Sequence, residues 1–299
     1  MNLRDLDYIC TVARLKHFGR AAKACHVSQP TLSSQIIKLE RELGVPIFER
    51  IRGAVKVTKE GTAIIEAAER ARSAAQDIKN IAKSFSDPFS GDVSLGVIPT
   101  IGPFLLPYFS GALFTTYPKL NLAYIEDMTE RLTAQLLGGT LDAAILATPP
   151  YDDNLISVPL YNEHFHVALP NTHKLCRQES ISLADLDTVT LLLLNEGHCL
   201  RDQALSVCSN TLQNQAIRAT SLDTLIGLVA GGHGATLIPT LAIRENWITG
   251  LGVTVRPLSS DIAYRQVNIT YRKSYTRPRL IEALRTIITA GLPTSVEKL

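Results

Sequence analysis

The N-terminal segment constrains the fold most, because three helical patterns are packed into its first 44 residues. Apolar residues recur at helical spacing over residues 3–13, from Phe18 to Cys25 and again from Leu32 to Leu43. Before the last run, Ser28 can cap a helix and Pro30 is tolerated in a first helical turn. Two short helices, a tight turn and a polar-headed third helix predict a helix-turn-helix.

The outward head of the third helix carries side-chain types that reach base edges and phosphates in a DNA major groove. Its apolar positions, Leu32, Ile36, Leu39 and Leu43, are expected to face inwards. The alternative interpretation is that this face of the helix is exposed to solvent and binds no DNA. The candidate DNA-binding residues of this helix are Gln29, Pro30, Thr31, Ser33, Ser34, Gln35 and Lys38.

The next segment, Ile47 to Thr58, alternates enough to predict a small hairpin. Arg50 and Arg52 lie in it and can contact phosphates, so the hairpin is expected to form a wing of the DNA-binding domain. The distribution of charge along the chain also supports a DNA-binding domain at the N-terminus. Residues 1–87 carry 15 Lys and Arg against 10 Asp and Glu, whereas residues 88–299 carry 15 against 18, so the N-terminal part is the basic part.

An Ala-rich helical pattern from Thr58 to about Ser84 follows the hairpin. An apolar stripe of this length usually packs against another helix. Residues 86–91, with Pro88 and Gly91, are expected to form a hinge. We therefore predict a DNA-binding domain at 1–58, a linker and dimerisation helix with hinge at 59–87, and a third domain at 88–299.

Strand and helix patterns alternate after the hinge, which predicts an α/β body with parallel sheets, divided into two lobes. The overall fold class is then α+β. The expected strands are 93–98, 121–126, 143–147, 167–169, 189–194, 217–220, 234–239 and 267–271, and the expected helices are 104–116, 132–137, 198–207, 222–230 and 279–290.

Two thiols lie in and after a polar turn that follows the apolar run 189–194. Gly197 suits a sharp exit from that run, and Cys199 then falls in the first turn of a short helix. There the free backbone N–H groups favour a thiolate, and His198 and Arg201 are close in sequence. The pattern predicts a low-pKa, oxidisable thiol at Cys199.

The second thiol, Cys208, lies nine residues further on, which on an unbroken helix means about 13.5 Å and the opposite face. A disulfide needs Cα atoms within about 7 Å, so a bridge between the two requires the helix to unwind. Buried packing of the cysteines is the alternative interpretation. A zinc site is not expected, since no second Cys or His pair lies nearby.

The motif Gly197-His198-Cys199-Leu200-Arg201-Asp202-Gln203-Ala204 with a later Cys208 resembles the sensing segment of the peroxide-responsive OxyR branch of the LysR-type transcription regulators. The resemblance to the family runs from Met1 to about Arg285 and includes Ala21-Ala22 and the segment from Ser28 to Ser33. It implies a winged helix-turn-helix, a linker helix and a regulatory domain of two lobes like periplasmic binding proteins.

The resemblance also implies site residues. Thr100 and Thr129 follow two predicted strands, where α/β folds bind ligands, although each is also a plausible helix cap. Arg265 matches a family arginine that supports the cysteine. The implied peroxide pocket consists of Thr100, Thr129, His198, Arg201, Asp202 and Arg265 around the redox-active pair Cys199 and Cys208.

Two positions depart from the family pattern. Gly53 stands where a second wing arginine is usual, and Ile37 replaces a residue that is commonly basic in this branch. These departures bear on the phosphate contacts and not on the fold.

The function expected from the resemblance is a regulator that binds promoter operators in double-stranded DNA and is switched by hydrogen peroxide. Expected partners are a second subunit, with dimers pairing to tetramers, RNA polymerase and a cellular dithiol reductant; no cofactor is expected. Arg4, Asp5 and Asp7 near the N-terminus argue against a signal peptide, so a cytoplasmic protein without a membrane span is expected.

Two other functions stay open on the residues alone. A LysR-type regulator can respond to a small metabolite in the cleft between the lobes, and this mode requires neither thiol. A thiol peroxidase would use Cys199 for the same first step, but it leaves the helix-turn-helix unexplained. We therefore do not expect an enzyme.

Overall fold

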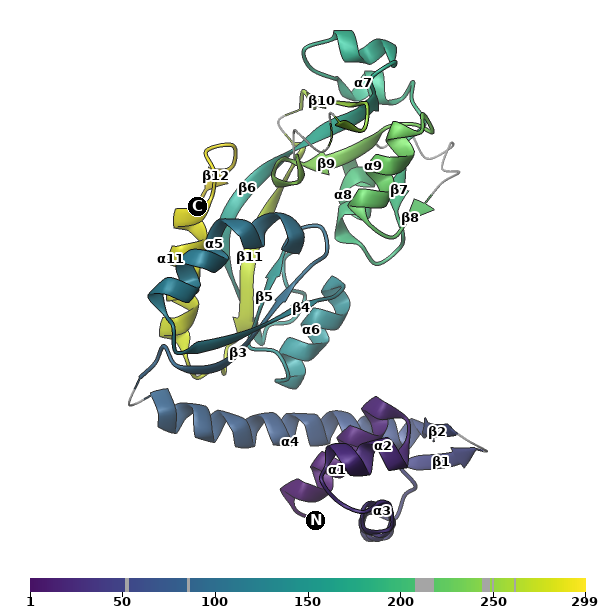
Figure 1. The fold of residues 1–299 in the computed structure, drawn as a ribbon, viewed down its shortest axis with the longest axis vertical. Helices are drawn as coiled ribbons and strands as arrows, with labels where there is room; N and C mark the ends of the chain where they lie inside the picture. Colours follow the sequence, from purple (N-terminus) through teal and green to yellow (C-terminus); the bar gives the residue numbers. More distant parts are fainter. Residues whose placement is uncertain (52–53, 85–86, 208–217, 244–247, 249, 261) are drawn as a thin grey trace. The chain divides into compact units, whose positions relative to one another are not determined.

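The computed structural model describes residues 1–299 except 52–53, 85–86, 208–217, 244–247, 249 and 261 (Figure 1). The chain divides into two compact units. Unit 1 consists of residues 1–86 with 137–140, and unit 2 consists of residues 87–136 with 141–299.

Unit 1 contains three short helices, a hairpin and a long helix, as the sequence predicts. Its elements are α1 (Leu3–Leu15), α2 (Phe18–Ala24), α3 (Gln29–Leu43), β1 (Phe48–Ile51), β2 (Ala54–Val57) and α4 (Lys59–Ser84). The expected caps of α3 are present: the Ser28 hydroxyl accepts the N–H of Thr31, and Gly44 follows the helix with φ of 74°. Thr58 accepts the N–H of Gly61 and so begins α4.

The core of unit 1 gathers apolar residues of α1, α2 and α3 and the first turns of α4. Leu32, Ile36 and Leu39 are buried as expected, but the expectation for Leu43 was wrong, because this last residue of α3 is 38% exposed. Ile65 of α4 is buried in this core, whereas Ile78 further along is 69% exposed. Among the α4 side chains that the structure describes, the apolar stripe is therefore buried near the start of the helix and exposed at Ile78.

Unit 2 is built on a mixed sheet. Among the described residues, eight strands join in the order β10-β6-β11-β5-β3-β4, with β9 and β12 also paired to β6. Among the named strands of the described residues, β3 with β4, β3 with β5, and the separate pair β7 with β8 are parallel, and the other pairs of unit 2 are antiparallel. The expected parallel arrangement was therefore wrong for β6, β9 and β11, and β10 and β12 were not expected as strands. The strands are β3 (Gly91–Val97), β4 (Leu120–Glu126), β5 (Ala143–Leu146), β6 (Leu155–Pro170), β7 (Leu193–Leu194), β8 (Arg218–Ala219), β9 (Thr236–Pro239), β10 (Val253–Pro257), β11 (Tyr264–Arg272) and β12 (Glu297–Lys298).

The helices of unit 2 agree with the expected ones within a few residues, and a few short elements add to them. They are α5 (Gly102–Thr116), α6 (Thr129–Gly138), η1 (Lys174–Arg177), α7 (Leu183–Leu186), α8 (Cys199–Val207), α9 (Leu222–Ala230), η3 (Thr240–Ala242) and α11 (Pro278–Gly291). In the described part of the chain, no helix combines the length and apolar character needed to cross a bilayer.

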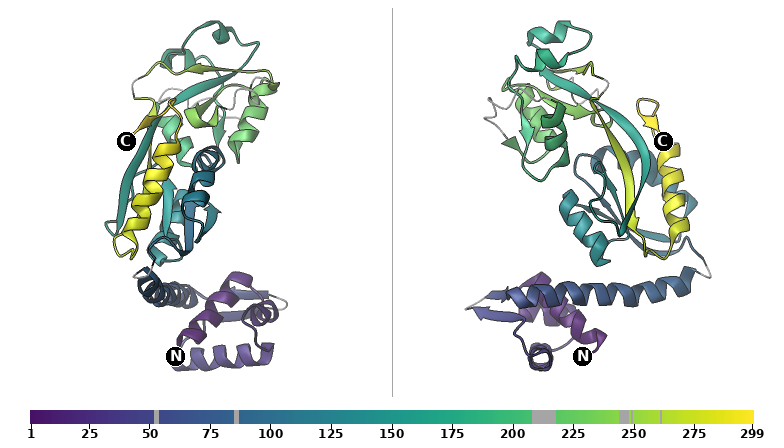
Figure 2. Two further views of the ribbon diagram at one scale, coloured as in Figure 1. Left: turned by 60° about the vertical axis from the view of Figure 1, so that its left-hand side comes forward. Right: turned by 180° about the vertical axis from the view of Figure 1, so that it is seen from behind.

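Two long strands, β6 and β11, connect the two parts of unit 2 (Figures 1 and 2). We call the part with β3, β4, β5, α5, α6 and α11 lobe I, and the part with β7 to β10, η1, η3 and α7 to α9 lobe II. The first part of β6 pairs with β11, and its last residues pair with β9 and β10. The sequence predicted only residues 167–169 of this 16-residue strand, and it predicted a strand over 189–194 where β7 has only two residues.

Candidate functional site

The thiol of Cys199 lies at the head of α8, in lobe II. Gly197 has φ of +93°, a conformation that L residues avoid, and this turn lets α8 begin at Cys199. The helix buries Leu200, Ala204 and Val207, which confirms the predicted helical face. Cys199 itself is only 8% exposed.

A small pocket surrounds the thiol. It joins three segments that lie far apart in the sequence, namely the ends of β3 and β4 and the turn before α8. The pocket is small, with an empty volume of about 160 Å³. The lining residues are Ile98, Pro99, Thr100, Met128, Thr129, Gly197, His198 and Cys199.

A buried arginine supports this pocket from behind Thr100. Arg265 of β11 is 2% exposed, and its guanidinium donates to the Thr100 hydroxyl at 3.0 Å and to the Thr100 carbonyl oxygen at 2.9 Å. The helix-cap interpretation of Thr100 was wrong, because Ile101 is the cap residue of α5 and the Thr100 hydroxyl binds Arg265 instead. The structure thus brings Thr100, Thr129, His198 and Arg265 together around Cys199.

Burial raises the pKa of the Cys199 thiol above its ordinary value of 9.0. The charge of Arg265, the Thr129 side chain and the N–H of Leu200 each act to lower that pKa, but they do not offset the desolvation. The Thr129 hydroxyl is otherwise without a partner in the described structure. The predicted low pKa was therefore wrong for this state, although the groups that stabilise a thiolate are in place.

Two expected helpers of the thiol do not act as predicted. Burial lowers the pKa of His198 below 6.5, so its imidazole is neutral near pH 7 and supplies no cation. The guanidinium of Arg201 lies 3.6 Å from Glu196 and outside the lining of the thiol pocket. Asp202 is exposed, lies outside that lining too, and its charge raises the thiol pKa. The sequence could not show which of these side chains face the thiol, because adjacent residues of a helix point to different sides.

Sequence reasoning missed two residues near the site. Glu163 is buried at 1% exposure and forms an ion pair with Arg265, 2.7 Å between Oε1 and Nη2. The sequence does offer one signal for Glu163. It is the one carboxylate in the mainly apolar stretch 155–170, and a charge that is buried there needs a partner. Gln203 is the other: its amide donates to the Ala147 carbonyl oxygen at 2.8 Å.

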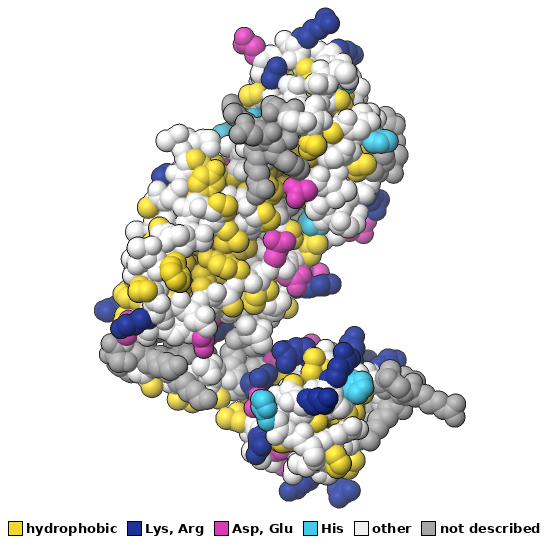
Figure 3. All heavy atoms as spheres, in the orientation of Figure 1, with side chains coloured by type: hydrophobic (Ala, Val, Ile, Leu, Met, Phe, Trp, Pro, Cys, Tyr) yellow, Lys and Arg dark blue, Asp and Glu magenta, His cyan; other side chains and the backbone are white. Residues whose placement is uncertain are grey.

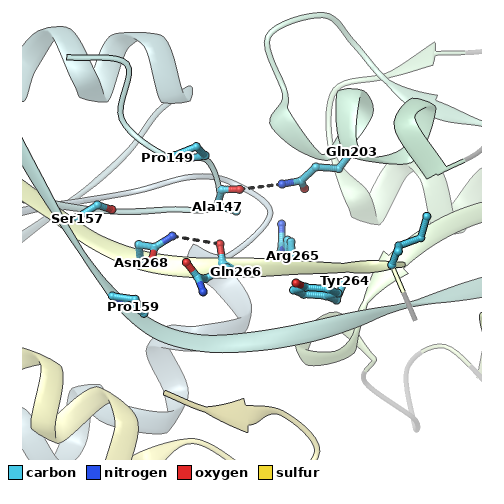
Figure 4. A pocket seen from close by; sticks show the side chains of 10 residues that line it. Ala147, Pro149, Ser157, Pro159, Gln203, Tyr264, Arg265, Gln266 and Asn268 are labelled. Atoms are coloured by element: carbon cyan, nitrogen blue, oxygen red, sulfur yellow. Dashed lines mark hydrogen bonds between the residues drawn. The ribbon is translucent and has the colours of Figure 1, made fainter. Parts of the chain in front are cut away.

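Figure 4 shows Gln203 reaching from α8 to Ala147 beside a cavity of about 560 Å³ between the lobes. This cavity lies where a cleft between the lobes is expected from the sequence. Arg265 borders both the cavity and Thr100 of the thiol pocket, so the two spaces share one wall. The other lining residues are Ala147, Pro149, Ser157, Pro159, Ile262, Tyr264, Gln266 and Asn268.

Of the two predicted redox residues, only Cys199 belongs to the described structure. Cys208 lies outside the described residues. The helix α8 is continuous from Cys199 to Val207, which spans about 12 Å along its axis. Among the described residues, no group of three or more His, Cys, Asp and Glu is placed to hold a metal ion.

The predicted DNA-binding residues of α3 lie on the surface of unit 1. Gln29, Pro30, Thr31, Ser34 and Lys38 are exposed, and Ser33 and Gln35 are half-buried. The hydroxyls of Ser28 and Thr31 are 2.7 Å apart, so Thr31 partly serves the helix cap. Several Lys and Arg side chains are visible on the same unit (Figure 3).

The predicted wing is present as the antiparallel pair β1 and β2. Arg50 lies in β1 opposite Val55, and its side chain is outside the described part, as are Arg52 and Gly53. Ile37, the other unusual position, is 44% exposed on α3.

Two protein-family descriptions match the chain, one in its N-terminal part and one in the remainder. Residues 3–62 match the bacterial regulatory helix-turn-helix protein, lysR family, and residues 86–293 match the LysR substrate binding domain.

Similar proteins match nearly the whole chain. The DNA-binding transcriptional dual regulator OxyR of Escherichia coli K12 is 40% identical over 291 residues, which are 95% of each chain. A full-length cysteine-to-aspartate variant of OxyR from Pseudomonas aeruginosa is 39% identical with a TM-score of 0.80, and the match covers 96% of this chain and 94% of that one. A hydrogen-peroxide-bound cysteine-to-serine mutant of OxyR from Corynebacterium glutamicum is 33% identical with a TM-score of 0.67, covering 97% and 92%.

Proposed function

Since the chain belongs to the LysR family of bacterial transcription regulators, in its OxyR branch, we propose that oxidation of Cys199 by hydrogen peroxide switches its action on DNA. Its relatives include a hydrogen peroxide-inducible genes activator, the regulator OxyR and a hydrogen-peroxide-bound OxyR mutant. The observation that carries the proposal is the Cys199 thiol, which shares one pocket with Thr100 and Thr129 and interacts electrostatically with Arg265.

In the first step the Cys199 thiolate attacks one oxygen of the peroxide. The S–O bond forms as the O–O bond breaks, the sulfur is oxidised to a sulfenic acid, and the other oxygen leaves as hydroxide that takes a proton to become water. Arg265 and Thr129 stabilise the thiolate, because both lower its pKa. The Thr129 hydroxyl can also donate to or accept from the peroxide, since it has no other partner in the described structure.

In the second step the Cys208 thiolate attacks the sulfenic sulfur of Cys199. The S–S bond forms, the S–O bond breaks, and the oxygen leaves as water after it takes a proton. While residues 199–207 stay helical, Cys199 is too far from the residue that follows the helix to form a disulfide with it. This step therefore unwinds α8. A cellular dithiol that takes the two sulfurs back to thiols resets the switch.

The output is a change in how the protein binds its operators. The exposed head of α3 and the β1–β2 wing contact double-stranded DNA, with Gln29, Thr31, Ser34 and Lys38 exposed for this purpose. The exposed Ile78 of α4 supports pairing of two subunits through this helix, and dimers pair to tetramers. Refolding of α8 alters the packing of the subunits and their contact with RNA polymerase. The same change in operator binding serves both activation and repression. The protein acts in the cytoplasm.

The other two functions are less well supported. The cavity between the lobes has the size of a ligand site, but several similar proteins are named OxyR or hydrogen peroxide-inducible genes activator. The relatives are also transcription regulators and not peroxidases.

Operator binding and transcription in vitro test the function. Wild-type protein and the Cys199→Ser variant are compared before and after a near-stoichiometric pulse of peroxide on the same promoter fragment. We expect the footprint and transcript level of the wild-type protein to change and those of the variant to stay in the unoxidised pattern. Equal responses of both proteins would contradict the proposal.

A further inference from the structure

Glu163 and Arg265 form a buried pair where the two long strands cross between the lobes. They are direct cross-strand partners in β6 and β11, and both are nearly inaccessible to solvent. Nε of Arg265 lies 2.9 Å from Oε1 of Glu163, and Nη2 lies 2.7 Å from the same oxygen. The other carboxylate oxygen accepts the N–H of Leu241 in η3 at 3.0 Å.

The guanidinium of Arg265 is held on two sides. Glu163 binds its Nε and Nη2, while Thr100 accepts from Nη1 and Nη2 with its hydroxyl and carbonyl oxygens. Thr100 belongs to the lining of the Cys199 pocket, so the chain of contacts runs from Glu163 to the reacting thiol. Glu163 itself is not part of that lining and cannot touch the reactants there.

Buried charges persist only when they are paired, and a planar guanidinium is best fixed by charge-assisted hydrogen bonds. Without the carboxylate, the hydrogen-bond partners left to Arg265 among the described residues are the neutral oxygens of Thr100, so its position against the pocket is less restricted. A misplacement of about 1 Å in the groups that position reactants can slow a reaction about a hundredfold.

We propose that Glu163 is a positioning residue for the oxidation of Cys199, because it fixes Arg265 against Thr100 at the wall of the thiol pocket. This rests on the proposed function, in which Cys199 reacts with hydrogen peroxide. Glu163 acts through Arg265 and Thr100.

The test compares two reactions of the same thiol in the full-length protein with a Cys208→Ser background, which stops the reaction at the sulfenic acid. One is oxidation by hydrogen peroxide, followed by trapping of the sulfenic acid and mass spectrometry. The other is alkylation by iodoacetamide, which needs the thiolate but no positioned peroxide. The ratio of the two rate constants cancels the thiolate fraction and reports positioning.

The variants are Glu163→Gln, which removes the charge, and Glu163→Asp, which keeps the charge on a shorter arm. Glu282→Gln is the matched control, because Glu282 forms a largely exposed ion pair with Arg285 on α11 of the same unit. We expect the ratio to fall roughly tenfold in Glu163→Gln, by less in Glu163→Asp, and to stay unchanged in Glu282→Gln.

The expected loss is about tenfold. The proposal is therefore overturned if the ratio in both Glu163 variants stays within about twofold of the ratio in the parent protein. If Glu163→Gln does not fold, as judged by its thermal transition, the Glu163→Asp ratio decides alone. Failure of the proposed function is distinguishable, since the parent protein itself would then form no sulfenic acid at Cys199.

Discussion

The side chain of Gln203 donates a 2.8 Å hydrogen bond to the carbonyl oxygen of Ala147 and thereby ties α8 of lobe II to the end of β5 in lobe I (Figure 4). Gln203 lies one helical turn after Cys199, so any unwinding of α8 that brings the two thiols together breaks this bond. This bond therefore holds α8 against the opposite lobe.

Replacing Gln203 with Ala removes that bond and is expected to speed the second step of oxidation. One hydrogen bond contributes about 0.5–1.5 kcal/mol, so disulfide formation should accelerate roughly twofold to thirteenfold while sulfenic acid formation is unchanged. Rapid-quench alkylation separates the two steps. Ser206→Ala, at an exposed position of the same helix, is the control; equal rates in both variants would show that the Gln203 bond does not restrain α8.

The rate of peroxide oxidation should increase with pH through the neutral range and beyond pH 9. Burial raises the pKa of Cys199 above 9.0, so the thiol is protonated at neutral pH and each rise in pH increases the reactive thiolate fraction. Stopped-flow oxidation of the Cys208→Ser variant measures this profile. A rate that is already constant between pH 6 and pH 8 would indicate a low thiol pKa and contradict the burial effect.

Thr100→Val should destabilise unit 2 and slow the oxidation of Cys199. The substitution preserves shape but leaves a buried N–H of Arg265 without its hydroxyl acceptor, which costs about 1–3 kcal/mol. We also expect a roughly tenfold slower peroxide reaction, because Arg265 is less well fixed. Thermal unfolding and sulfenic acid trapping check both effects against Thr115→Val on the exposed face of α5. Wild-type behaviour of Thr100→Val would remove Thr100 from the site.

Lys38→Ala should weaken operator binding about equally for specific and non-specific DNA. Lys38 is exposed on α3 with no ion pair among the described residues, so it is expected to contact a phosphate. The slope of log affinity against log salt should then decrease by about 1. Fluorescence anisotropy at several salt concentrations measures the slope. Lys174→Ala, an exposed lysine of unit 2, serves as the control, and the same slope for both variants would place α3 away from the phosphates.

The local structure was largely predictable from the sequence, because it depends on neighbouring residues. Ser28 and Gly44 mark the ends of α3, and Gly197 marks the turn before α8. The helices and most strands follow from apolar spacing. The length of β6 did not, since the charged and polar residues Asn162, Glu163 and His164 interrupt its apolar pattern.

The site was predictable only in part, because its electrostatics depend on burial and long-range contacts. The motif around Cys199 and the threonines after two strands identified the pocket. Arg265 and its partner Glu163 are separated by about a hundred residues, and only the pairing of β6 with β11 brings them together. The raised pKa of Cys199 likewise reflects desolvation that no sequence neighbour reveals.

The most direct test of the switch is the redox state of Cys199 and Cys208 after a brief, near-stoichiometric pulse of hydrogen peroxide, read by thiol alkylation and peptide mass mapping. Our account predicts an intramolecular disulfide between Cys199 and Cys208 that is absent in the Cys199→Ser variant. Two thiols that stay reduced while the protein still binds operator DNA would contradict the redox switch and direct attention to the cavity between the lobes.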